Sequence, residues 1–145
     1  MTTTHTPVAT AASTGAGMFQ TRLEIGTAPW HATLIADEPR ALGGLDTGPN
    51  PYDLLAAALA TCTTMTLRWH AARKGWDIGT VATTVTHSRV AGATPPDRFD
   101  RAITLDPALD PAVRDDLLAI AERCPVHKTL TAGAVVATQM AATAP

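Results

Sequence analysis

The amino-acid sequence predicts an α+β fold, in which an antiparallel sheet packs on a long central helix. The expected elements follow one another as two strands, a long helix, two strands, a helix and a strand. This order favours an antiparallel sheet with helices on one face. The stretch 51–74 is apolar nearly all round its expected helix, and such a helix is buried on most sides. One small sheet can hardly bury it, so we also expect an intertwined homodimer.

The length and charge of the chain limit its organisation and its partners. A chain of 145 residues suggests one domain. We expect a disordered tail rich in Thr, Ala and Gly over residues 1–16 and a single domain over residues 17–145. The net charge of −2 favours neither nucleic acid nor an anionic membrane as a partner.

The sequence gives no indication of a membrane segment or of export. No apolar stretch approaches the roughly 18 residues that are needed to span a bilayer. The N-terminus lacks the basic start and the apolar block of a secretory signal. We therefore expect a cytoplasmic protein, in which two cysteines are more often free or reactive thiols than a permanent bridge.

The first two strands are expected over residues 18–26 and 30–38. Both runs are rich in β-prone residues, and Thr27, Ala28 and Pro29 separate them. Two such runs joined by a short turn are typical of a β-hairpin.

The long helix is expected over residues 51–74, after a loop dense in Pro and Gly at residues 39–50. Asn50 suits the N-cap and Pro51 suits the first helical position. Gly75 ends the helix, because glycine is favoured directly after a helix C-terminus.

The second half of the chain contains the remaining elements. Strands are expected over residues 81–90, 98–106 and 132–140, with a helix over residues 110–124 and a short helical turn over residues 125–130. Asp110 suits the cap of this helix and Pro111 its first position.

The two cysteines of the chain, Cys62 and Cys124, are the candidate reactive groups. Cys62 lies in the Ala-rich long helix, where its residue type alone favours a small buried side chain. An apolar site in mid-helix raises the pKa of a thiol. Cys124 precedes Pro125 and therefore suits the N-cap of a helical turn, whose free N–H groups and dipole favour a thiolate. The local sequence makes Cys124 the more acidic thiol.

Metal binding and a disulfide are the two other uses of these cysteines. Two cysteines and scattered histidines fall short of the usual structural zinc signature, so we expect no metal and no organic cofactor. Cys62 and Cys124 are far apart in the sequence, which neither supports nor forbids a disulfide, because the geometry of the fold decides it.

Two segments together resemble the OsmC/Ohr family. They are "GLDTGPNPYDLLAAALATCTTMTLRWHAARKGW" and, far downstream, "ERCPVHKTL". The stretch "GPNPYDLL" is similar to the G-P-x-P-Y-[DE]-L-L stretch of the small OsmC-like branch, and the "ADEP…GG" run at residues 36–44 also fits that branch. The resemblance covers about residues 17–140, so the expected domain is an OsmC-like one.

The resemblance implies a thiol peroxidase that reduces organic hydroperoxides. In this family the helix cysteine becomes a sulfenic acid, a second cysteine condenses with it to a disulfide, and a small dithiol reopens the bond. Cys62 would then be the peroxidatic thiol and Cys124 the resolving one. The resemblance also implies a tightly wrapped homodimer with its sites at the subunit interface. The order of roles conflicts with the local argument for Cys124, and we follow the family, because groups from a second subunit are invisible in the sequence.

The resemblance also implies an Arg and a Glu that activate the attacking thiol. The family Glu falls ten residues before the helix cysteine, where this chain has Tyr52. Its neighbour Asp53 is the candidate catalytic carboxylate, although nine residues correspond to about half a turn away from the face of Cys62. Asp53 can instead complete a capping box with Asn50.

The activating arginine comes from an early strand or loop of the family fold. Arg22 in the first strand is the preferred candidate, and Arg40 in the following loop is the alternative. Either can simply be a surface charge. Glu38 is a further possible carboxylate.

The substrate pocket is expected to contain Tyr52, Met65, Trp69 and His127. Trp69 lies near the Cys62 face of the helix, where it can also be a core or interface contact. Two other functions remain open. One is a non-catalytic OsmC-like protein that binds a small hydrophobic ligand at the dimer interface, and the other is a thiol–disulfide redox regulator of protein partners.

Overall fold

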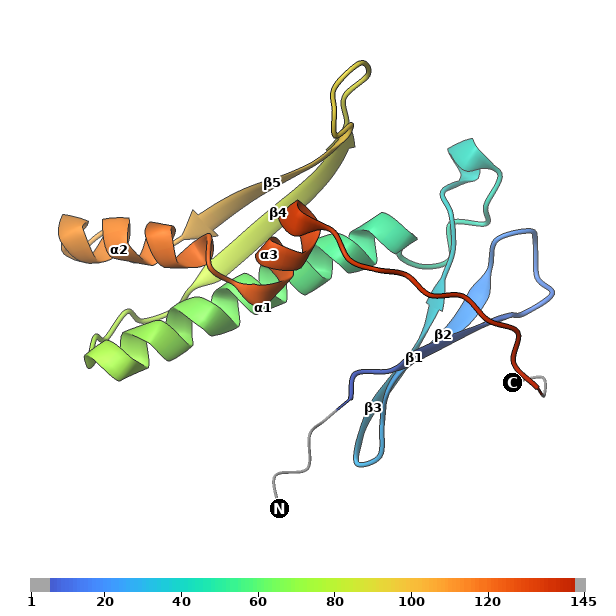
Figure 1. Ribbon diagram of the computed structural model, residues 1–145, viewed down its shortest axis with the longest axis horizontal. Helices are drawn as coiled ribbons and strands as arrows, with labels where there is room; N and C mark the ends of the chain where they lie inside the picture. Colours follow the sequence, from blue (N-terminus) through green and yellow to red (C-terminus); the bar gives the residue numbers. More distant parts are fainter. Residues whose placement is uncertain (1–5, 143–145) are drawn as a thin grey trace. The chain divides into compact units, whose positions relative to one another are not determined.

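The computed structural model describes residues 6–142, and the chain divides into two compact units (Figure 1). The first unit comprises Met1–Leu54 with Ala141–Pro145, and the second comprises Leu55–Met140. Both contain antiparallel strands, and the helices complete an α+β fold as predicted. The prediction of a single domain over residues 17–145 stays a prediction.

The first unit contains a three-stranded antiparallel sheet in the order β1-β2-β3. Strands β2 (Thr21–Thr27) and β3 (Trp30–Ala36) form the predicted hairpin, with slightly shifted ends. Strand β1 (Ala9–Ser13) pairs with β2 and lies inside the segment for which we expected disorder. Its small, β-compatible side chains are exposed, so the pairing rests on backbone hydrogen bonds. Residues 1–5 of the expected tail lie outside the described residues.

The loop after β3 is organised by the buried carboxylate of Asp37. Asp37 accepts hydrogen bonds from the backbone N–H groups of Glu38, Leu45 and Thr47 and from the Thr47 hydroxyl, at 2.8–3.3 Å. Burial disfavours the charge, but these hydrogen bonds outweigh it and lower the pKa of Asp37. The ionised side chain thus holds the residues that lead to the long helix.

Helix α1 (Pro51–Lys74) has the predicted bounds. Asn50 and Asp53 form a capping box, in which each side chain accepts a hydrogen bond from the other residue's backbone N–H at 2.9 and 3.0 Å. Gly75 follows the helix with φ +69°, the left-handed conformation that ends helices. Within residues 6–142 no helix, α1 included, is long and apolar enough to cross a lipid bilayer.

The second unit joins α1 to a hairpin and two shorter helices (Figure 1). Strands β4 (Ala82–Arg89) and β5 (Asp97–Thr104) pair in antiparallel register, with Val85 opposite Arg101. Helix α2 (Pro111–Ala121) starts after the predicted Asp110 cap, and α3 (Pro125–Ala132) follows almost at once.

The core of this unit lies where α1 and α2 pack together. Its buried residues are Leu67, Ala71, Ile78, Val81, Leu117, Ile120 and Ala121. On α1 the buried residues recur every four positions, at Leu59, Thr63, Leu67 and Ala71, which is one stripe of a helix. Leu55, Met65 and Trp69 of the same helix are exposed. A single chain therefore buries only one face of α1, and burial of the helix on most sides stays a prediction that depends on the expected homodimer.

The predicted closing strand over residues 132–140 is wrong for this chain. Ala132 is the last residue of α3, and the structure assigns neither helix nor strand to residues 133–141. Val135, Val136 and Met140 are almost fully exposed. A strand needs a hydrogen-bonded neighbour, and within residues 6–142 the sheets contain only β1 to β5. The β-prone residue types of this segment therefore do not suffice to form a strand.

Candidate functional site

Cys62 and Cys124 meet inside the second unit, although they are remote in the sequence. Both are free thiols, and the Cys62 thiol donates a hydrogen bond to the sulfur of Cys124. Cys62 on α1 is partly exposed, whereas Cys124 is fully buried. The sequence left their proximity open, and the fold brings them together.

The local backbone explains the position of Cys124. Helix α2 ends at Ala121, and Pro125 starts α3 at its first position, so Cys124 is the N-cap of α3 as predicted. Its sulfur accepts a hydrogen bond from the His127 N–H at 3.3 Å. The thiol thus occupies the place where a helix N-terminus presents free N–H groups and a positive dipole end.

The two thiols differ in acidity. Burial disfavours the Cys124 thiolate, but hydrogen bonds to its sulfur outweigh this effect and lower the pKa of Cys124. The donors, in decreasing order of effect, are the His127 N–H, the Cys62 thiol, the Thr63 hydroxyl and the Val126 N–H. Burial raises the pKa of Cys62, and the hydrogen bond that it donates to Cys124 adds to the rise. The buried thiol is therefore the more acidic one.

A buried threonine and arginine adjoin Cys124. The Oγ1 atom of Thr63, which is fully buried, lies 3.8 Å from the sulfur of Cys124 and 2.7 Å from the Leu59 carbonyl oxygen. Arg101 on β5 donates from its guanidinium to Thr63 Oγ1 and to the Ala121 carbonyl oxygen, both at 3.1 Å. The arginine thus connects the strand to the thiol site.

The backbone N–H of His127 contacts the Cys124 sulfur, and its side chain pairs with Glu122. Its Nε2 atom lies 3.4 Å from Glu122 Oε2, and Arg101 donates to the other oxygen of that carboxylate at 2.6 Å. The His127 side chain also borders a hollow of about 270 Å³ with Leu59 and Phe99. His127 is therefore close to Cys124 but does not border the larger pocket described next.

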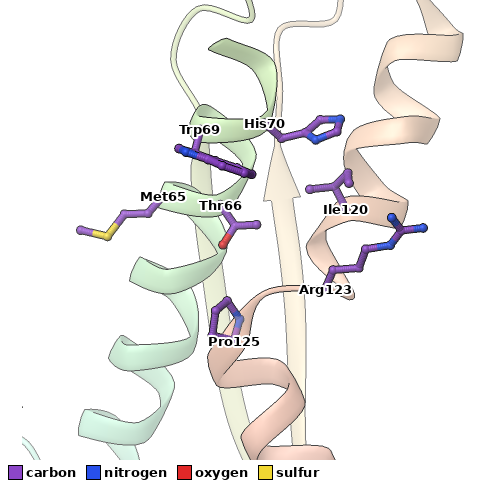
Figure 2. Close-up of a pocket in the computed structure, with 7 residues that line it drawn as sticks. All are labelled: Met65, Thr66, Trp69, His70, Ile120, Arg123 and Pro125. Atoms are coloured by element: carbon purple, nitrogen blue, oxygen red, sulfur yellow. The ribbon is translucent and has the colours of Figure 1, made fainter. Parts of the chain in front are cut away.

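A mostly apolar pocket of about 640 Å³ lies beside the segments that carry the two cysteines, and its lining includes neither cysteine. Its lining residues are Met65, Thr66, Trp69, His70, Ile120, Arg123 and Pro125 (Figure 2). Figure 2 shows Met65 and Trp69 of α1 on one side, with Ile120 and Arg123 on the other. Thr66 donates a hydrogen bond to the Cys62 carbonyl oxygen at 2.7 Å, and Pro125 directly follows Cys124. The pocket therefore borders the backbone that carries both sulfurs, and an apolar molecule fits its walls.

Three predicted site residues belong to the first unit. Arg22 is exposed and pairs with Glu24 at 3.1 Å, Asp53 is engaged in the capping box, and Tyr52 is partly exposed in the first turn of α1. Arg40, the alternative arginine, lies in the short helix η1 (Arg40–Leu42). A role of Arg22 or Asp53 in activating Cys62 and of Tyr52 in the pocket stays a prediction.

Sequence reasoning missed Arg101 and did not connect Thr63 with Cys124. Burial alternates along β5, and Phe99, Arg101 and Ile103 share its inner face. Because side chains alternate between the faces of a strand, the apolar Phe99 and Ile103 could have indicated that Arg101, between them, also points inward. Thr63 belongs to the buried stripe of α1 at a spacing of four from Leu59 and Leu67. Among residues 6–142, no cluster of three His, Cys, Asp or Glu side chains is arranged to hold a metal ion.

The fold is that of a known family. The sequence profile described as "OsmC-like protein" matches residues 44–139, more than half of the chain. The chain belongs to this OsmC-like family. A search of curated proteins found no match.

Solved structures share the fold. A protein from Psychrobacter arcticus 273-4, described as an osmotic stress induced and detoxification response protein, has a TM-score of 0.69 at 24% identity, covering 89% of this chain and 91% of its own. The organic hydroperoxide resistance protein OsmC from Legionella pneumophila has a TM-score of 0.65 at 24% identity, covering 87% and 89%. An organic hydroperoxide resistance protein from Elizabethkingia anophelis has a TM-score of 0.66 at 20% identity, covering 89% and 91%.

Proposed function

We propose that this protein is a cysteine-dependent peroxidase that reduces organic hydroperoxides in the cytoplasm. The observation that supports this most is the contact between the partly exposed Cys62 and the buried, more acidic Cys124. Two similar structures are named as organic hydroperoxide resistance proteins. The apolar pocket beside Thr66 and Pro125 suits the organic part of such a substrate.

In the first step Cys62 attacks the hydroperoxide. Cys62 is the thiol that a substrate can reach, and the Cys124 thiolate, which accepts its hydrogen bond, takes its proton. The Cys62 sulfur then bonds to the terminal peroxide oxygen and the O–O bond breaks. The alkoxide that leaves takes a proton from the solvent, which balances the proton that Cys124 released when it ionised, and becomes the alcohol. Cys62 becomes a sulfenic acid.

In the second step Cys124 resolves the sulfenic acid. The Cys124 sulfur bonds to the Cys62 sulfur, and the sulfenic oxygen leaves with the thiol proton as water. The sum is one hydroperoxide and two thiols converted to one alcohol, one water and one disulfide. A small dithiol reopens the disulfide by thiol–disulfide exchange and is itself oxidised.

One equivalent of cumene hydroperoxide is therefore expected to consume both thiols of each reduced chain and to release one equivalent of cumyl alcohol. The thiols are counted with a chromogenic disulfide and the alcohol by chromatography, with thiol-alkylated protein as the control. A disulfide between Cys62 and Cys124 lowers the mass of the chain by two hydrogens. Intact thiols after an hour with the hydroperoxide would contradict the proposal.

The same experiment separates the two other functions. A protein that only binds a small hydrophobic ligand keeps both thiols reduced and yields no alcohol. A redox regulator forms the disulfide with a disulfide oxidant, but it does not convert the hydroperoxide stoichiometrically. The mostly apolar pocket is the feature that favours the binding protein as the second candidate.

We propose that the active protein is a homodimer. Val135 and Val136 after α3 are exposed in the single chain, and so are Leu55, Met65 and Trp69 on α1. Large apolar side chains gathered on one helix, as on α1, typically mark an interaction surface. We expect sedimentation equilibrium to give twice the chain mass of 15.1 kDa at micromolar concentration. A mass of one chain over that range would contradict this arrangement.

A further inference from the structure

We propose that Arg101 is a positioning residue of the thiol site, which acts on Cys124 through the hydroxyl group of Thr63. This inference deepens the proposed function, because it concerns the thiol to which resolution is assigned. It starts from the placement of Arg101, whose side chain is only 10% exposed although it is charged. A charge buried to this degree requires hydrogen-bonded partners.

The guanidinium of Arg101 has three such partners, and all belong to the surroundings of Cys124. It donates to Thr63 Oγ1 at 3.1 Å, to the Ala121 carbonyl oxygen at 3.1 Å and to Glu122 Oε1 at 2.6 Å. Ala121 and Glu122 lead directly to Cys124, whose N–H donates to the Ala121 carbonyl oxygen at 3.3 Å. Arg101 thus fixes the chain that presents the sulfur.

The Thr63 hydroxyl can donate a hydrogen bond to Cys124 only if its proton turns away from its other acceptor. A hydroxyl has one proton, and Thr63 has two acceptors in reach, the Leu59 carbonyl oxygen at 2.7 Å and the Cys124 sulfur at 3.8 Å. The carbonyl is the better acceptor while the thiol is neutral. Once Cys124 is ionised, the charge-assisted bond to sulfur is the stronger one, and the proton turns to it.

Arg101 makes this turn more favourable. Its N–H fills a lone pair of Thr63 Oγ1, so the hydroxyl proton has to point elsewhere, and a donor bonded to a cation polarises the O–H group. Thr63 is fully buried, and a buried hydrogen bond is weakly screened by solvent. Arg101, Thr63 and Cys124 therefore form a series of hydrogen bonds, in which the Arg101 cation stabilises the Cys124 thiolate indirectly, through the Thr63 hydroxyl.

Other groups also act on Cys124. The titratable or charged ones around it are Cys62 on α1, Arg101 on β5, Glu122 and Arg123 after α2, and His127 on α3. Among the described residues, Arg101 is the one charged group with a hydrogen bond to the Thr63 hydroxyl. Variants in which only Thr63 or Arg101 is changed therefore measure the effect of the proposed hydrogen bonds on Cys124.

The test measures the titration of Cys124 by thiolate absorbance at 240 nm, in a Cys62→Ser background where Cys124 is the only thiol. No hydroperoxide is used, so the result is independent of whether the proposed peroxidase function is correct. We expect Arg101→Gln and Thr63→Val each to raise the Cys124 midpoint by about one pH unit. The double variant is expected to shift it no further than the larger single shift, because Arg101 acts through Thr63.

Matched variants separate this role from a merely structural one. Thr63→Ser keeps the hydroxyl and is expected to restore the parent midpoint, and Arg101→Lys is expected to restore it in part. Arg98→Gln, on the same strand, removes an exposed arginine that pairs with Asp100 and is expected to leave it unchanged. Additive shifts in the double variant, or an unchanged midpoint in Thr63→Val, would overturn the proposal. If Arg101→Gln does not fold, the Thr63→Val and Thr63→Ser pair together with Arg101→Lys still decides it.

Discussion

Replacement of Cys62 by serine is expected to lower steady-state hydroperoxide turnover at least about a hundredfold. A serine hydroxyl at this site has no thiolate form, so it can neither cleave the O–O bond nor form the sulfenic acid. The assay follows consumption of cumene hydroperoxide in the presence of a small dithiol. Because Cys62 is partly exposed, the substitution is not expected to unfold the chain.

Cys124→Ser is the matched control for this prediction. It leaves the accessible thiol in place and removes only the buried one, so the first turnover still yields one equivalent of alcohol, but more slowly, because Cys124 no longer takes the Cys62 proton. The Cys62 sulfenic acid then has no resolving partner and is trapped by dimedone with the corresponding gain in mass. Turnover by Cys62→Ser equal to that of the wild type would show that another group reduces the hydroperoxide.

The structure explains how two opposed arguments about the thiols are compatible. The local sequence made Cys124 the more acidic thiol, and the family resemblance made Cys62 the attacking one. In the fold, Cys124 is the more acidic thiol but is buried at a helix N-cap, whereas Cys62 on α1 is the less acidic thiol but is partly exposed. The acidic sulfur accepts a hydrogen bond from the accessible one, so it can act as its base.

The bounds of α1 and the start of α2 were predictable from the sequence because their signals are local, whereas α2 ends at Ala121, before the predicted end at residue 124. Asn50 with Pro51, Gly75 and Asp110 with Pro111 fix the bounds of α1 and the start of α2, and each acts on backbone groups within one turn. The N-cap position of Cys124 followed from Pro125 in the same way. These interactions need no knowledge of the rest of the fold.

Strand pairing was less predictable because it depends on a distant partner. Residues 132–140 have the composition of a strand but no strand assignment, whereas β1 forms in a segment of plain Thr and Ala because β2 offers it an edge. The meeting of Cys62 with Cys124 is non-local in the same sense. Arg101 was missed for another reason: charged residues are mostly exposed, and only the alternation of β5 places it inside.

Replacement of Leu117 by alanine is expected to lower the free energy of unfolding by about 2–5 kcal/mol. Leu117 on α2 is fully buried in the cluster that contains Leu67 of α1 and Ala121, and truncation leaves a cavity between the two helices. The neighbouring residue provides the matched control, since Leu118 is 50% exposed. Leu118→Ala is expected to cost less than about 1 kcal/mol.

Denaturant unfolding of both variants, followed by circular dichroism, measures these differences from the shift of the midpoint. The comparison holds residue type and helix constant and changes only burial.

The Leu117→Ala substitution also bears on the thiol site, because the Ala121 carbonyl oxygen accepts a hydrogen bond from Arg101 at 3.1 Å. A loosened α2 should therefore disturb the cap that holds Cys124, and the Leu117→Ala variant should form the Cys62–Cys124 disulfide more slowly. Equal destabilisation by the two substitutions would show that the packing of α2 on α1 does not stabilise this unit.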